Sequence, residues 1–299
     1  MKIEPMLAAA VAAFLMFGGA AAAAEPAPAP QRAAGRSDWF EPEPPYRVIG
    51  NIYYVGPRGL GVFLIASDEG HILLDGGMPQ NAPMIADSIR ALGFDLADVR
   101  ILVNSHAHVD HSGGLAALKE MTGAKLVASE GDRSALETGL ILGSEEYLAA
   151  AAPPVKVDEI IGDGEAVSVG GARLVANITP GHTRGCTSWT TTAEEQGKTY
   201  SVLFFCSASV AINRLVPPLQ YEGIVEDYRR TFARTRDWRP DVFLANHPEF
   251  YGEDEKRARQ IAGDALAFVD RKGFPAWRAR MEKEFEDALA KQVAASRAE

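Results

Sequence analysis

The sequence predicts a layered α/β sandwich. Short apolar strands alternate with amphipathic helices in two similar blocks, and each block ends in a histidine-bearing loop that follows an apolar strand. The chain has 299 residues, of which 47% are hydrophobic and 23% charged, so it is long enough to bury a full core in one large domain.

The first block opens with a predicted β-hairpin over residues 61–75, in which two apolar runs flank a turn-forming tetrad at 67–70. Apolar residues at helical spacing predict a helix over 80–92, and Gly93 ends it. An apolar run at 100–104 predicts the strand that leads into the histidine cluster. The block then continues with a helix over 113–121, a strand over 125–128 and a helix over 132–138.

The second block follows a long apolar segment, 139–157, which contains prolines and has no clear period, as is typical of a lid or binding loop. Its expected elements are strands over 166–169, 173–178, 187–192 and 200–206, a helix over 226–236 and a buried strand over 241–246. A stripe with a four-residue spacing predicts a core-facing C-terminal helix. The stripe comprises Trp277, Met281, Phe285, Leu289 and Val293.

The N-terminal residues resemble an export signal. Residues 6–24 are mostly alanine and end in a small-residue cleavage pattern, which predicts a signal peptide over 1–24, a Pro/Ala-rich flexible linker over 25–37 and a folded domain over 38–299. A retained membrane anchor is the alternative, but this stretch is short and weakly apolar for a spanning helix. We therefore expect a periplasmic protein without stable membrane association after cleavage, and a monomer.

The charge balance excludes one class of partner. The formal net charge is −10 and the pI is about 5.2, whereas nucleic-acid binding requires clustered Lys and Arg. We therefore expect no nucleic acid and a small-molecule substrate.

Three of the six histidines lie within residues 105–114, directly after the apolar run. His106 and His108 are two apart on an extended segment, so their imidazoles point the same way and can reach one ion. Asp110 and His111 follow where the next helix begins and face a different direction. One cluster can therefore supply ligands to two neighbouring metal positions.

Each position needs a further nitrogen, and His182 and His247 both lie on loops just after predicted strands. A lone histidine is commonly a hydrogen-bonded loop or core residue. Here, however, closely packed imidazoles and a carboxylate would be left unsatisfied without a cation. This sulfur-free donor set suits Zn²⁺ best, with Fe, Mn or Co as alternatives. Two metal ions with open positions imply hydrolysis.

With their surroundings, these residues resemble the metallo-β-lactamase superfamily and, within it, the metallo-β-lactamases of subclass B3. The resemblance runs from about Asp38 to the C-terminal helix and implies a four-layer αββα sandwich with the site at one edge. The matching segments are 38–40, 50–56, 69–77, 104–114 and 179–189.

The resemblance implies two zinc ions per chain and a catalytic role for Asp110, which would orient a zinc-bound bridging hydroxide for attack on the β-lactam amide. Penicillins, cephalosporins and carbapenems are the implied substrates. The implied ligands are His106, His108 and His182 for the first zinc, and Asp110, His111 and His247 for the second.

Other members of the superfamily bridge their metals with an aspartate near positions 206–207, but no Asp occurs between His182 and Asp227. This absence argues against the alternative function, a dizinc hydrolase of another ester, thioester or lactone. The resemblance makes Ser207 and Ser209 hydrogen-bond donors to the substrate carboxylate. Alternatively, these serines satisfy the backbone at a strand end.

Cys186 and Cys206 are the only cysteines and lie on neighbouring predicted strands, so an exported chain is expected to join them in a disulfide; two reduced thiols are the alternative. Cys206 as a metal ligand is disfavoured, because alternation along the strand turns it away from the side that Ser207 faces. Asp75 either supports the ligand loop or caps a turn. Trp39, Tyr54 and residues 139–157 are candidate substrate walls, with ordinary core or surface packing as the alternative for each, and Arg214 has no firm role.

Overall fold

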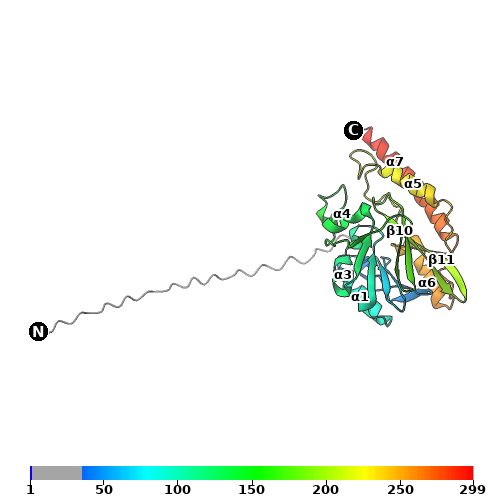
Figure 1. Cartoon of the computed structure of the whole chain (residues 1–299). Coiled ribbons are helices and arrows are strands. Elements are labelled where there is room, and N and C mark those ends of the chain that lie inside the picture. Colours follow the sequence, from blue (N-terminus) through cyan, green and yellow to red (C-terminus); the bar gives the residue numbers. More distant parts are fainter. Residues whose placement is uncertain (2–35, 299) are drawn as a thin grey trace. The chain divides into compact units, whose positions relative to one another are not determined.

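A computed structural model describes Met1 and residues 36–298 (Figure 1). The predicted signal peptide, apart from Met1, and most of the predicted linker lie outside the described residues. None of the helices within residues 36–298 is long and apolar enough to cross a membrane.

The first sheet has seven strands, in the order β1 to β7, and is antiparallel from β1 to β4 and parallel from β4 to β7. The predicted hairpin is confirmed as β3 paired with β4, with Phe63 opposite Leu74. The strands are β1 (Tyr46–Ile49), β2 (Ile52–Tyr54), β3 (Phe63–Ile65), β4 (His71–Leu74), β5 (Val99–Val103), β6 (Lys125–Ala128) and β7 (Glu159–Ile160).

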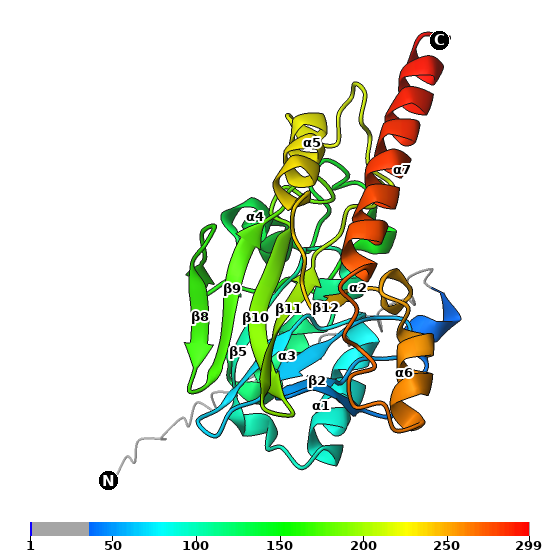
Figure 2. The same cartoon turned by 90° about the vertical axis from the view of Figure 1, so that its right-hand side faces the viewer.

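The second sheet has five strands in the order β12-β11-β10-β9-β8, which Figure 2 shows side by side. Both β9 and β11 are antiparallel to β10, and β11 is parallel to β12, so β9, β11 and β12 run in one direction. The strands are β8 (Ala166–Val169), β9 (Ala172–Ile178), β10 (Thr187–Glu195), β11 (Lys198–Phe205) and β12 (Val242–Ala245).

Helices cover the outer faces of both sheets. They are α1 (Ala82–Ala91), α2 (Val109–Ser112), α3 (Leu115–Thr122), α4 (Glu130–Thr138), α5 (Ile224–Thr235), α6 (Glu253–Ile261) and α7 (Gly273–Ser296). Five short 3₁₀ helices join them at Ser37–Phe40, Pro79–Asn81, Leu96–Asp98, Leu148–Ala150 and Pro248–Phe250. Residues 139–157 are otherwise irregular, as predicted.

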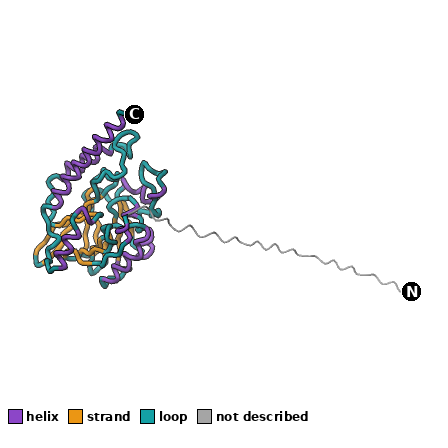
Figure 3. The backbone as a smooth tube through the Cα atoms, turned by 180° about the vertical axis from the view of Figure 1, so that it is seen from behind, coloured by secondary structure: helices purple, strands orange, loops and turns teal. Residues whose placement is uncertain are grey.

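Alternation along β11 explains the layering. The Phe204 ring packs 5.1 Å from Phe63 of the other sheet, whereas the next side chain, Phe205, packs 5.1 Å from Trp277 of α7. A separate apolar cluster joins the far face of the first sheet to α1 and α3, with Ile85 and Leu118 fully buried. Helices therefore lie outside two facing sheets, and the predicted αββα sandwich is confirmed (Figures 1 and 3).

The predicted stripe on the C-terminal helix is confirmed for Trp277, Met281 and Phe285, which are buried in the core, and Leu289 packs partly buried against it, whereas Val293 is not part of the core. The sequence patterns missed β1, β2, β7 and α6. Helix α6 is almost entirely polar and has no apolar period; it docks through polar contacts, such as the hydrogen bond from the Tyr46 hydroxyl to Glu253 at 2.8 Å.

Candidate metal centre

The site lies where strands of both sheets end. The loops that carry the predicted site residues begin directly after β4, β5, β9, β11 and β12, at Asp75, Asn104, Thr179, Cys206 and Asn246. Strands that run in the same direction end at one edge of a sheet, which is where α/β folds place ligands. The fold therefore gathers residues that are more than 140 positions apart in the sequence.

His106, His108 and His182 converge and form what we call the first group. Nε2 of His182 lies 3.1 Å from Nε2 of His106 and 3.1 Å from Nδ1 of His108. Burial lowers the pKa of His108 to about 4 and holds the pKa values of His106 and His182 well below the usual range. All three rings are therefore uncharged at neutral pH, with lone pairs available for a metal ion.

Asp110, His111 and His247 form the second group. Oδ2 of Asp110 lies 3.1 Å from Nε2 of His111 and 3.5 Å from Nε2 of His247, and these two nitrogens are 3.2 Å apart. Burial lowers the pKa of His247 to about 4. Burial also disfavours the charged form of His111, but the Asp110 carboxylate outweighs it and raises the His111 pKa. The second group therefore carries charge, unlike the first.

The two groups are neighbours, since the rings of His106 and His111 have centroids 4.5 Å apart. The first group has the atom types and separations that a metal ion requires, as does the set His106, Asp110 and His111, and the donor atoms of the second group lie within 3.5 Å of one another. The structure thus brings together all six residues that the resemblance named as ligands. By contrast, His71 is buried in the hairpin against Phe94, away from both groups.

Neighbouring groups fix the imidazole orientations in the first group. Nδ1–H of His182 donates to the carbonyl of Ser209 at 2.7 Å, which leaves Nε2 free to face the group. Nδ1 of His106 lies 3.2 Å from Ser105 Oγ and 3.2 Å from the Asn246 side-chain amide. Sequence reasoning missed Ser105 and Asn246, because serine and asparagine have no distinguishing pattern at a strand end.

Asp75 supports the ligand loop, as one of its two predicted roles required. Its buried Oδ1 accepts hydrogen bonds from the backbone N–H of Ser105 at 2.6 Å and from the side chain of Asn104 at 2.9 Å. The loop therefore leaves β5 in a fixed direction, which sets the start of the segment that carries His106.

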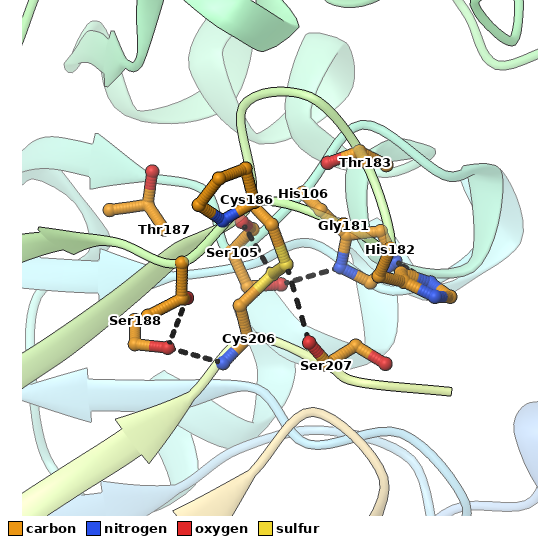
Figure 4. Close-up of a disulfide and its surroundings, with 12 residues drawn as sticks. Ser105, His106, Gly181, His182, Thr183, Cys186, Thr187, Ser188, Cys206 and Ser207 are labelled. Carbon is orange, nitrogen blue, oxygen red and sulfur yellow. Dashed lines mark hydrogen bonds between the residues drawn. A yellow bond between two sulfur atoms is a disulfide. The ribbon is translucent and has the colours of Figure 1, made fainter. Parts of the chain in front are cut away.

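The predicted disulfide between Cys186 and Cys206 is present, with their Cα atoms 5.8 Å apart (Figure 4). Cys186 lies at the end of the loop that carries His182, and Cys206 directly precedes Ser207. The Cys206 Sγ atom also contacts the Ser105 carbonyl at 3.1 Å. Cys206 is consequently not available as a ligand while the bond is intact. The disulfide instead holds three segments together, namely those that carry His182, Ser207 and His106.

Ser207 and Ser209 border the first group. Ser207 is buried, and its Oγ lies 3.4 Å from Ser209 Oγ. Ser209 is more accessible, and its Oγ lies 3.4 Å from Nδ1 of His182. Of the two serines, Ser209 is therefore the better placed to meet a molecule that enters the site.

The structure places some of the candidate substrate walls at the site and others in the core. The Trp39 ring lies 5.9 Å from the His247 ring, at the border of the second group. Tyr54 is fully buried, and its hydroxyl donates to the carbonyls of Pro57 and Leu60. The expectation that Tyr54 forms a wall is therefore wrong, because it is a core residue with a satisfied hydroxyl.

Residues 139–157 do reach the site. Ile141 and Leu142 line a pocket together with His108 and His182. Arg214, whose role the sequence left open, donates to Ser144 Oγ at 3.1 Å and to the Gly143 carbonyl, and so fastens this segment to the chain beyond Ser209.

Comparison with known proteins agrees with this geometry. Residues 56–194 match the family model of the metallo-β-lactamase superfamily. Among solved structures, BJP-1 of Bradyrhizobium japonicum, a subclass B3 metallo-β-lactamase, is 44% identical with a TM-score of 0.84, and the alignment covers 87% of this chain and 98% of that one. FEZ-1 of Legionella gormanii, a metallo-β-lactamase, is 35% identical with a TM-score of 0.82, covering 85% and 98%. An N-acyl homoserine lactonase of a Bacillus species is 27% identical over 220 residues, covering 66% of this chain and 82% of its own length.

Proposed function

Because this chain belongs to the metallo-β-lactamase superfamily, with subclass B3 enzymes among its relatives, and is a hydrolase of that superfamily, we propose that it is a zinc-dependent β-lactamase. The proposed substrates are penicillins, cephalosporins and carbapenems. One observation carries the proposal: two adjacent ligand groups bordered by the Ser207–Ser209 pair, where other hydrolases of the superfamily place a bridging aspartate.

The two groups fit zinc ions. Ligands bound at about 2.0–2.1 Å around a tetrahedral zinc ion place their donor atoms roughly 3.3 Å apart. The separations of 3.1 Å in the first group and 3.1–3.5 Å in the second are of this size. Uncharged imidazoles whose lone pairs face one another also need a cation between them. We assign the first zinc to His106, His108 and His182, and the second to Asp110, His111 and His247.

The chain's own residues would orient the reaction. When bound, the two zinc ions supply Lewis acidity toward the lactam carbonyl and a nucleophilic water at neutral pH. Asp110 is buried, but His111 outweighs the burial and lowers the Asp110 pKa, so the carboxylate is ionised and can accept a hydrogen bond from the attacking water. The Ser209 hydroxyl would donate to the substrate carboxylate and hold the lactam carbonyl toward the first group. Attack at that carbonyl breaks the C–N bond, and the nitrogen takes up a proton.

A second candidate function is hydrolysis of another ester, thioester or lactone, which the similarity to N-acyl homoserine lactonases favours. The same ligand groups would serve such a reaction. The serine pair separates the two candidates, because a substrate without a carboxylate has no use for its hydroxyls.

We further propose that the protein acts in the periplasm as a monomer on a small-molecule substrate. The alanine-rich residues 6–24 and the cleavage pattern support export. The disulfide supports an oxidising compartment.

The test follows the hydrolysis of imipenem and a penicillin spectrophotometrically, with purified mature protein, while zinc content is measured on the same sample. We expect turnover that a chelator abolishes and added zinc restores, with about two zinc ions per chain. Bound zinc without lactam turnover, together with activity on a lactone or thioester panel, would replace the proposal with the second candidate.

A further inference from the structure

A buried carboxylate outside both ligand groups joins the two loops of the first group. Asp132 lies in the first turn of α4, and the residue is 3% exposed. Its Oδ2 accepts hydrogen bonds from the backbone N–H of Ala107 at 3.0 Å and from the Thr183 hydroxyl at 2.9 Å. Its Oδ1 accepts the backbone N–H of Gly185 at 2.9 Å. All three donors are neutral.

The donors stand beside ligands. Ala107 lies between His106 and His108 in the loop after β5 of the first sheet. Thr183 follows His182 in the loop after β9 of the second sheet. Asp132 therefore bonds directly to both loops through one carboxylate group, across the junction of the two sheets.

Backbone contacts hold α4 at a fixed distance from the His182 loop. A Cβ on Gly131 would lie 2.7 Å from Cα of Gly185, and a Cβ on Gly185 would lie 2.2 Å from the backbone nitrogen of Asp132. The Ser129 hydroxyl also donates to the Gly185 carbonyl at 2.6 Å. Because glycine faces glycine here, the helix cannot shift without moving the loop, and the position of the carboxylate is set by the main chain.

Burying a carboxylate among neutral donors costs stability, and burial raises the pKa of Asp132 to about 6. A neutral hydrogen-bonding residue would avoid this cost. An acidic residue offers two acceptor oxygens, so that Oδ2 takes one donor from each loop while Oδ1 takes a second donor from the His182 loop. The arrangement is therefore suited to fixing the loops relative to each other.

We propose that Asp132 is a positioning residue that sets the distance of His182 from His106 and His108, and so determines the affinity of the first metal position. The inference rests on the proposed function only in requiring metal ions at these histidines. It does not depend on which substrate is hydrolysed.

The test titrates the metal-free protein with Co²⁺ and, against a chromophoric chelator, with Zn²⁺. In Asp132→Asn, which keeps the size of the side chain, one acceptor becomes an NH₂ group that faces an N–H or O–H donor. We expect the first position to lose affinity by about 10–100-fold and its cobalt absorption bands to change, with the second position altered by less than about threefold.

The matched control is Asp158→Asn. Asp158 also accepts a backbone N–H, from Leu126 at 2.9 Å, but it follows the 139–157 segment directly, pairs with Lys119 and contacts neither ligand loop. We expect Asp158→Asn to leave the metal affinities of the first and second positions unchanged. Thr183→Val removes one donor while leaving the two backbone hydrogen bonds, so it should give a smaller loss than Asp132→Asn, and it serves in its place if that variant fails to fold.

Thermal unfolding of each metal-free variant separates a local effect from general destabilisation. Unchanged metal affinities and cobalt spectra in folded Asp132→Asn, or in folded Thr183→Val if the former does not fold, would overturn the proposal. Because the readout needs no substrate, a protein that binds two metals normally but ignores β-lactams would refute the proposed function and leave this inference standing. A wild-type chain that binds no metal would refute both.

Discussion

The two ligand groups of the site are built differently although they share one loop. In the first group every ligand is an uncharged imidazole, and Nδ1 of His182 is held by the Ser209 carbonyl at 2.7 Å. In the second group a carboxylate faces two imidazoles, and Nδ1 of His111 has no hydrogen-bond partner among the described residues. Exposure is similar, since each group has a fully buried histidine, His106 or His111, and a partly exposed one, His108 or His247.

This difference indicates that the two groups bind their metals under different constraints. Neutral, buried and hydrogen-bonded ligands keep a fixed geometry, because they lose little freedom when a metal binds. The second group carries charge and borders Trp39, so its occupancy should depend more on pH and on what enters the site. We therefore expect changes in the first group to be more damaging than equivalent changes in the second.

The largest expected effect is that of His182→Ala. This change removes one of the three ligands of the first group and leaves two loops without their common metal. We expect turnover of imipenem to fall by at least roughly a thousandfold and the zinc content to fall to about one per chain. His71→Gln is the matched control, since His71 is also a buried histidine but contacts neither group; it should keep its zinc and its activity.

His247→Ala tests the comparison directly. We expect the loss of the second zinc and a decrease in turnover of roughly 10–100-fold, because the first group remains intact. Zinc content and steady-state kinetics on the same sample would measure both effects. A decrease as large as that of His182→Ala would show that the two groups are equivalent and would end the comparison.

The pH dependence of metal binding should also separate the two groups. The Asp110 carboxylate raises the pKa of His111, so in the metal-free protein His111 holds a proton at pH values where an unperturbed histidine begins to lose it, and a metal must displace that proton. The histidines of the first group have lowered pKa values, about 4 for His108, and offer no such competition there.

Acidification should therefore weaken the second position first, by about tenfold per pH unit for one displaced proton once the pH is below the His111 pKa, while the first position stays unchanged until near pH 4. Zinc titrations at a series of pH values would check this. Two binding steps that weaken in parallel from pH 7 would contradict it.

The sequence and the structure agree where local patterns decide the outcome. The hairpin around residues 67–70 and the apolar stripe of α7 follow from alternation and helical spacing, and both are present. The HxHxDH spacing placed two metal positions on one loop, because an extended segment followed by a helix turns successive side chains in two directions. The need for a further nitrogen at each position then pointed to His182 and His247, which lie on loops after predicted strands, and the resemblance to a known family assigned one to each position.

The missed residues act through tertiary contacts. Asp132 has no distinguishing feature in the sequence, because acidic residues are common in the first turn of a helix, where they interact favourably with the helix dipole. Asn246 is a polar residue at a strand end. Tyr54 lies in a segment that matches the family, yet its side chain is in the core. Nothing in their sequence spacing distinguishes these roles, since each depends on segments that are far apart in the chain.

The smallest expected effect concerns the serine pair that borders the first group. Ser209→Ala should raise the KM for a penicillin by about 3–10-fold with little change in kcat, since it removes a single partly solvated hydrogen bond to the substrate carboxylate. Ser207→Ala is the comparison, and its effect on KM should be smaller because Ser207 is buried beneath Ser209. Zinc content should stay the same in both, because His182 is oriented by the Ser209 backbone carbonyl, which neither substitution removes. Loss of zinc in Ser209→Ala, with KM unchanged, would mean that the hydroxyl supports the ligand and not the substrate, and the serine pair would then no longer favour a β-lactam over a lactone.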